Sequence, residues 1–166
     1  RFGGIRQVGR IQLFRNMTNV ITKMGDALQQ ILGANADTPP DQFSANILVC
    51  GSLSGGTGSG ASLDIAYIVR QLIHSRFNAY ETNLKLYGMF LMPECIIQHA
   101  KKDLSDTRHR ELRANAFAAM KEIDYWMRQE VHGDVLTVRY PGLQAEWNCR
   151  PFNYLGYLGH TWENGI

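Results

Sequence analysis

The stretch Asn46-Ile-Leu-Val-Cys-Gly51, continued by Ser52-Leu-Ser-Gly-Gly-Thr-Gly-Ser-Gly60, decides the fold of this chain. Residues 46–51 form a short apolar run without polar alternation, which is typical of a strand buried on both faces of a parallel sheet. The glycine- and serine-rich residues 52–60 follow at once, and residues 61–77 then carry the apolar spacing of a helix. A strand, a glycine-rich turn and a helix in succession predict the first unit of an α/β fold.

The same alternation continues on both sides of this unit. Residues 6–32 carry apolar side chains at steps of three and four, which places them on one face of a long helix. Residues 84–92 read as a second buried strand and residues 106–129 as a third helix. Two further strand candidates, 134–138 and 152–158, lie near the end. Helices alternating with apolar strands predict an α/β fold with a parallel sheet and flanking helices.

Composition excludes several classes of protein. The chain has 166 residues and a net charge of +2, which is too small for a direct nucleic-acid binder. No apolar run is long enough to span a membrane. The cysteines, Cys50, Cys95 and Cys149, are odd in number and far apart, so they predict neither a disulfide framework nor a zinc site. Together these features predict a cytoplasmic protein, with Cys50 as a small core residue of its strand.

The glycine-rich stretch suits an anion. At a helix start the first backbone N–H groups lack partners, and the helix dipole is positive there. Glycines let an anion approach the backbone, while Ser54, Thr57 and Ser59 offer hydroxyl donors, so the stretch predicts a phosphate cradle. The alternative is a flexible turn that binds nothing. No lysine follows a glycine here, as a Walker-A loop requires, and the glycine spacing departs from the Rossmann fingerprint.

The string Ser54-Gly-Gly-Thr-Gly-Ser-Gly60 resembles the phosphate-binding signature of the tubulin/FtsZ superfamily at every position. The opening Arg1-Phe-Gly-Gly-Ile-Arg-Gln-Val-Gly-Arg10 is similar to the preceding phosphate loop and helix of these proteins. Arg113-Ala-Asn-Ala116 resembles the FtsZ helix that follows the sugar loop. The chain is most similar to the divergent bacterial tubulin-like proteins. The resemblance implies a tubulin/FtsZ-type, Rossmann-like nucleotide-binding core, with residues 1–166 forming the middle part of a GTP-binding domain that is incomplete at both ends.

The resemblance also implies a function. The cofactors would be GTP or GDP with Mg²⁺, and the parent protein would be a cytoskeletal-type GTPase that self-associates head to tail into protofilament-like polymers. Hydrolysis would be completed by a catalytic loop from the neighbouring subunit, which this chain does not carry. Implied ribose or base contacts are Glu94, Asp106 and Arg113. The implied phosphate contacts are Ser54, Gly55, Gly56, Thr57, Gly58, Ser59 and Gly60, together with Gly3 and Gly4.

Two other functions remain open on the sequence. A scaffold module with a degenerate nucleotide site would assemble without nucleotide, and a dinucleotide-dependent enzyme domain would bind NAD(P) instead of GTP. Asp64, expected in the first turn after the glycine loop, either helps to place Mg²⁺ or complements the positive end of the helix dipole.

Overall fold

A computed structural model describes residues 5–33, 37–99, 104–133, 135–140, 143–147 and 149–159. In these ranges the chain forms helices and strands in alternation, followed by a strand hairpin and a last strand. The elements are α1 (Arg6–Arg15), α2 (Met17–Gly33), β1 (Ala45–Ser52), α3 (Gly56–Arg76), the 3₁₀ turn η1 (Asn78–Tyr80), β2 (Leu84–Leu91), α4 (Pro93–His99), α5 (Asp106–Met127), α6 (Gln129–His132), β3 (Leu136–Tyr140), β4 (Leu143–Trp147) and β5 (Tyr154–Leu158).

The central sheet is parallel, which confirms the predicted α/β class. Its strand order is β1-β2-β5, with Ala45 opposite Leu84 at one end of the first pair and Leu91 opposite Leu158 at the far end of the second. A parallel strand must be reached by a crossover connection. Helix α3 makes the crossover from β1 to β2, and the segment containing α5 makes the crossover from β2 to β5.

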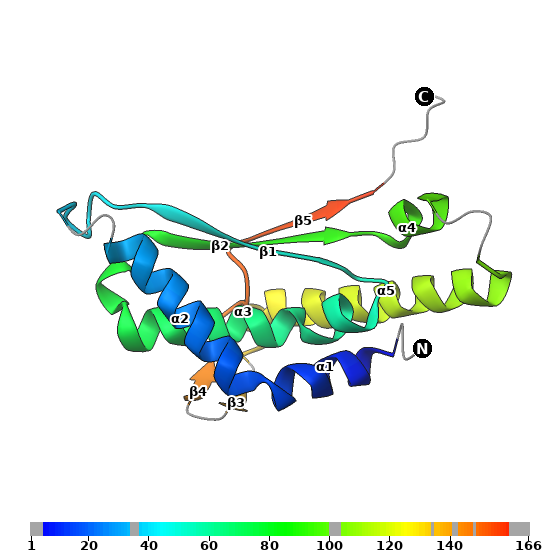
Figure 1. Ribbon diagram of the computed structural model, residues 1–166, viewed down its shortest axis with the longest axis horizontal. Helices are drawn as coiled ribbons and strands as arrows, with labels where there is room; N and C mark the ends of the chain where they lie inside the picture. Colours follow the sequence, from blue (N-terminus) through cyan, green and yellow to red (C-terminus); the bar gives the residue numbers. More distant parts are fainter. Residues whose placement is uncertain are drawn as a thin grey trace, which may run out of the picture.

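Helices α1, α2, α3 and α5 lie on one face of this sheet, and α4 lies beyond the end of β2 (Figure 1). Successive right-handed crossovers that advance in one direction across a sheet place their helices on the same side, which explains why α3 and α5 share a layer. The core lies between the two layers, where Leu86 and Phe90 of β2 are buried beneath the helices. Helix α3 is the central helix of the layer, and its Ile68 and Leu72 are fully buried.

The other face of the sheet is open, so the expectation of strands buried on both faces is wrong. Strand β1 alternates between half-buried and exposed residues, and Leu48 is 53% exposed. In register with it, Tyr87 and Tyr154 stack on the same face with ring centroids 4.8 Å apart. Cys50 also lies on this face and is exposed, which corrects its expected role as a core residue.

The first predicted helix is interrupted. The helix expected over residues 6–32 breaks at Asn16, which caps α1, and α2 starts afresh at Met17. Met17 is buried, but Ile11 of α1 is 57% exposed. The apolar residues of the two helices therefore do not share one face. The reason is that the buried residue of α1, Gly9, faces α3.

The helix that contains the glycine-rich stretch, α3, starts earlier than expected. Helix α3 begins at Gly56, with Gly55 as its N-cap, so residues 56–60 of the glycine-rich stretch form its first turns. Glycine has poor helix propensity, which hides this helix start from a periodicity argument.

The remaining differences between the predicted and the observed elements lie in the connection from β2 to β5. The helix predicted over 106–129 ends at Met127, and the short α6 follows Arg128. Strands β3 and β4 pair antiparallel as a separate hairpin, of which only the first strand was expected. No helix in the described ranges is both long and apolar enough to cross a membrane.

Candidate functional site

Several helix starts gather at the carboxyl end of the parallel strands. Figure 1 shows α1, α3 and α5 beginning at the same end of the molecule, the end at which β1 and β2 finish. Each helix start presents unpaired N–H groups and a positive dipole end. In open α/β sheets, ligands bind in the crevice at the carboxyl ends of the strands. This end of the sheet is therefore where a phosphate group is best accommodated.

The glycines of the loop permit very close packing of α1 on α3. A Cβ atom built on Gly9 would lie 2.2 Å from the carbonyl oxygen of Gly56, and one on Gly60 would lie 2.1 Å from that of Arg6. A Cβ on Gly56 would lie 2.6 Å from the carbonyl oxygen of Ile5. Since these distances are too short for any side chain, the two helices touch through their backbones, and their N-termini lie together.

Gly58 serves the loop itself. A Cβ on Gly58 would lie 2.3 Å from the carbonyl oxygen of Ser52, so only glycine lets the chain fold back onto the end of β1. Gly55 is different, because a Cβ there would meet nothing within 4 Å. Its backbone is extended, with φ −85° and ψ 162°, so it tolerates a side chain. Gly55 is thus an open position at the start of α3.

The hydroxyl groups of the loop have three different environments. The Ser59 hydroxyl is buried and donates to the carbonyl oxygen of Gly55 within the first turn of α3. Thr57 is exposed. Ser54 is fully buried, and its Oγ has no hydrogen-bond partner in the described structure. A buried polar atom without a partner is uncommon and costs free energy, so the Ser54 Oγ is an unfilled hydrogen-bonding position in the loop.

Helix α5 reaches the same loop. The Asn115 side-chain amide donates to the carbonyl oxygen of Ser54 over 3.1 Å. This residue was not singled out from the sequence, although it lies inside the quoted string Arg113-Ala-Asn-Ala116. The packing of Ala116 into the core orients α5 so that the preceding residue faces the loop.

Two of the three expected sugar contacts come together. The Arg113 Nε donates to the Glu94 carboxylate over 3.4 Å, which joins α5 to the helix that follows β2. Both side chains are about half exposed. Asp106 lies in the first turn of α5 and is exposed. The Glu94–Arg113 pair therefore stands at the carboxyl end of the sheet with its polar atoms accessible.

Asp64 has neither of the roles expected for it. It lies well inside α3, because that helix begins at Gly56, so it does not complement the helix dipole. Its buried carboxylate accepts two hydrogen bonds from Arg10, at 2.8 and 2.9 Å, and one from the Tyr140 hydroxyl at 3.0 Å. These partners occupy the carboxylate, which therefore connects α1, α3 and β3.

Gly3 and Gly4, expected to contact phosphate, lie outside the described residues. Within the described ranges, no three acidic, histidine or cysteine side chains gather into a group that could hold a metal ion. Mg²⁺ commonly binds nucleotide sites through the phosphates and water with only one or two carboxylates, so a dedicated protein cage is not needed for it.

The fold and the loop together define a nucleotide-binding type of α/β core. Comparison with known families agrees, because the family described as "Tubulin like" matches residues 3–163. The chain belongs to this tubulin-like family. Neither a curated protein nor a solved structure matches the chain.

Proposed function

We propose that this tubulin-like protein binds GTP or GDP at the carboxyl end of its sheet, with the phosphates on the residues from Ser54 to Gly60. The observation that carries the proposal is the contact between the N-termini of α1 and α3, where Ile5 meets Gly56. Two helix starts side by side offer two sets of free N–H groups and two positive dipole ends to one anion. The buried Ser54 Oγ, which has no partner, adds a hydrogen-bonding position in the same loop.

The residues of the loop have different proposed roles in packing and in phosphate binding. Gly56 and Gly60 permit the close backbone contacts that bring α1 against α3, and Gly58 lets the loop fold back onto the end of β1. Gly55 and Thr57 are the accessible positions, so they come closest to a bound phosphate. The other proposed phosphate contacts are Ser54 and Ser59 in this loop, and Gly3 and Gly4 before α1.

Residues beyond the loop select and orient the nucleotide. Glu94 and Arg113 are proposed to contact the ribose or base, with Asp106 as a further candidate. Bound GTP and Mg²⁺ would supply the phosphoanhydride and the charge-neutralising cation, and the chain's own contribution would be to hold the phosphates with preorganised donors. Nucleotide-dependent head-to-tail assembly, with hydrolysis completed by a neighbouring subunit, follows from the family as a proposal.

The decisive experiment is a titration of this chain with a fluorescent GTP analogue in the presence of Mg²⁺. The test variant is Gly55→Val, because valine suits the extended backbone of Gly55 and its bulk would fill the open space at the helix start. The matched control is Gly33→Val, since Gly33 also has open space around its Cβ position but lies at the end of α2. Thermal unfolding of both variants checks that they fold.

We expect saturable binding that GTP displaces and NAD does not, with at least about tenfold weaker binding in Gly55→Val and unchanged binding in Gly33→Val. A tenfold loss corresponds to about 1.4 kcal/mol of binding free energy. Displacement by NAD would favour the alternative function, a dinucleotide-dependent enzyme domain. No binding, together with light scattering that reports assembly without nucleotide, would overturn the proposal in favour of the scaffold.

A further inference from the structure

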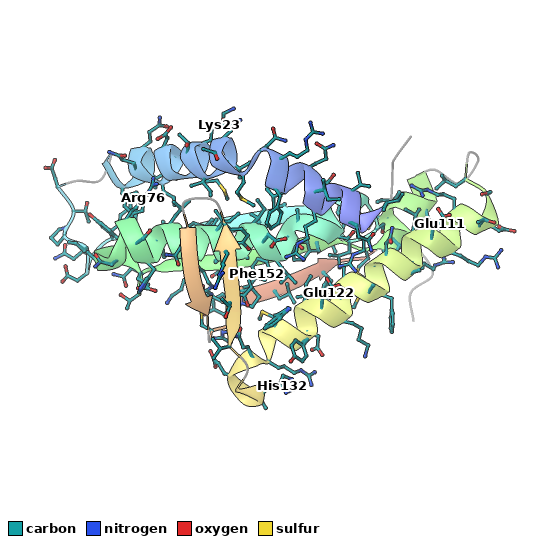
Figure 2. All side chains as sticks on the ribbon, turned by 90° about the horizontal axis from the view of Figure 1, so that it is seen from below. Lys23, Arg76, Glu111, Glu122, His132 and Phe152 are labelled. Atoms are coloured by element: carbon teal, nitrogen blue, oxygen red, sulfur yellow. The ribbon has the colours of Figure 1, made fainter. Side chains whose placement is uncertain are left out.

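A cavity lies on the side of the helix layer away from the sheet. It has a volume of about 600 Å³ and is lined by residues of α1, α3, α5 and strand β3. Figure 2 shows the hairpin lying across α3, with α1 and α2 on one side of α3 and Glu122 of α5 on the other. Cavities of ~300–1,000 Å³ are the usual size of small-molecule sites.

The carboxylates of this cavity are already paired. Asp64 accepts from Arg10 and Tyr140, as described above, and it is 5% exposed. Glu122 accepts from Arg6, whose guanidinium also donates to the carbonyl oxygen of Ser59 at 3.1 and 3.3 Å. Neither acid is left to bind a cation, and each neutralises one arginine.

Arg139 supplies the remaining charge. It lies on β3, lines the cavity and is exposed, and it forms no ion pair with the described residues. With Arg6 and Arg10 each matched by an acid, Arg139 gives the described lining of the cavity a net positive charge. A guanidinium with free donors recognises carboxylate, sulfonate or phosphate oxygens, often with two parallel hydrogen bonds.

Aromatic side chains form much of the remaining wall. The Phe14 and Tyr140 rings lie with centroids 5.8 Å apart, and the Arg10 guanidinium carbon is 5.6 Å from the Phe14 centroid. Trp126 lines the cavity from α5. Phe14 is still 39% exposed, so this apolar surface is accessible to a ligand.

We propose that this cavity binds a small organic anion with a flat apolar body, its charged group on Arg139 and its body against Phe14 and Trp126. The proposal does not rest on nucleotide binding, although Ser59 and Gly60 of the glycine-rich stretch also line the cavity. The combination of one unmatched guanidinium, two neutralised acids and an aromatic wall favours an aromatic carboxylate or sulfonate over a cation or a neutral molecule.

The test uses 8-anilinonaphthalene-1-sulfonate, a fluorescent aromatic sulfonate, titrated against the full chain in two series, one without nucleotide and one with GTP. Arg139→Gln removes the charge, and Arg150→Gln removes an exposed arginine that does not line the cavity. Thr137→Trp fills the cavity from β3 without changing charge, and tryptophan suits a strand. Nile red, which is neutral, reports purely apolar binding, and circular dichroism checks the folding of each variant.

We expect Arg139→Gln to raise the dissociation constant of the sulfonate about tenfold and to leave Nile red binding unchanged, because the lost interaction is a charge-assisted hydrogen bond. Thr137→Trp should abolish the saturable sulfonate signal, and Arg150→Gln should match the wild type. Equal sulfonate affinity in the wild type, Arg139→Gln and Thr137→Trp would place the dye elsewhere, for example on the open sheet face, and would overturn the proposal.

Discussion

The Arg10 guanidinium donates two hydrogen bonds to the carboxylate of Asp64, from Nε at 2.8 Å and from the adjacent amino group at 2.9 Å. This bidentate pair joins α1 to α3 just after the turns in which the two backbones touch. The hydrogen bond to Asp64 is the main cause that raises the pKa of Arg10, so the guanidinium stays charged. Because Asp64 is buried, its charged carboxylate is stabilised by these donors and would be destabilising to the fold without them.

Removing the Arg10 guanidinium should destabilise the fold. We expect Arg10→Met to lower the free energy of unfolding by about 2–4 kcal/mol, because it leaves a buried carboxylate with only the Tyr140 hydroxyl as donor. Urea denaturation measures the change. The double variant Arg10→Met/Asp64→Leu should recover part of the loss, since it removes the unpaired charge as well. A cost below about 0.5 kcal/mol for Arg10→Met alone would show that the pair is not a structural link.

Alanine at Gly9 should loosen the contact between α1 and α3. A Cβ there would lie 2.2 Å from the carbonyl oxygen of Gly56, and backbone atoms cannot rotate away as a side chain can. We expect Gly9→Ala to lower the free energy of unfolding by about 2 kcal/mol or more, despite the better helix propensity of alanine. Gly33→Ala, where the space is open, should be neutral or slightly stabilising. Equal effects in urea denaturation would contradict the backbone contact.

The order of elements could be predicted from the sequence because it depends on local patterns. The apolar runs of β1, β2 and β5 and the helical spacing of α3 and α5 are each visible in a short window. The open sheet face could not be predicted, because an apolar strand has the same composition whether one or both of its faces are covered. Strand β4 did have a signal, the turn dipeptide Pro141-Gly142 in the sequence before it.

In the candidate site, too, local patterns could be predicted from the sequence and contacts between distant residues could not. The string of residues from Ser54 to Gly60 is contiguous, so its resemblance to a phosphate loop is readable in the sequence. The contact of Asn115 with Ser54 and that of Arg10 with Asp64 join residues more than fifty positions apart. Such contacts depend on how the helices are packed, and no local pattern encodes them. The glycines also had a packing role that their resemblance to a phosphate loop did not reveal.

Buried tyrosines should make the fold sensitive to alkaline pH. Burial is the main cause that raises the pKa of both Tyr67 and Tyr140 above the ordinary value near 10. Above that value the unfolded chain loses these protons while the folded chain keeps them, so the free energy of unfolding falls as pH rises. We expect urea denaturation at pH 8 and above 10 to show this loss. Tyr140→Phe should reduce the slope, and an unchanged slope would contradict the assignment.

The three cysteines should react with a thiol reagent at different rates. Cys50 is exposed on the open sheet face, so Ellman's reagent should label it first in the native protein. Cys149 should react slowly, because it is half buried and burial is the main cause that raises the pKa of its thiol. The variant Cys50→Ser should lose the fast phase. If that phase persists undiminished in Cys50→Ser, another thiol gives it, which would contradict the accessibility of Cys50 on the open sheet face.

The Glu94–Arg113 pair offers a test of the nucleotide site that stability does not confound. Both side chains are about half exposed and their atoms are 3.4 Å apart, so the pair itself contributes less than about 0.5 kcal/mol to folding. We expect Arg113→Ala to leave thermal unfolding unchanged but to weaken binding of the fluorescent GTP analogue by at least about fivefold, because it removes a charged contact to the ligand. Arg128→Ala is the matched control, since Arg128 also forms an exposed ion pair, with Asp124, at the other end of α5. If the two variants bind the analogue with equal affinity, Arg113 does not contact the nucleotide, and the ribose or base must be held by other residues at the end of the sheet.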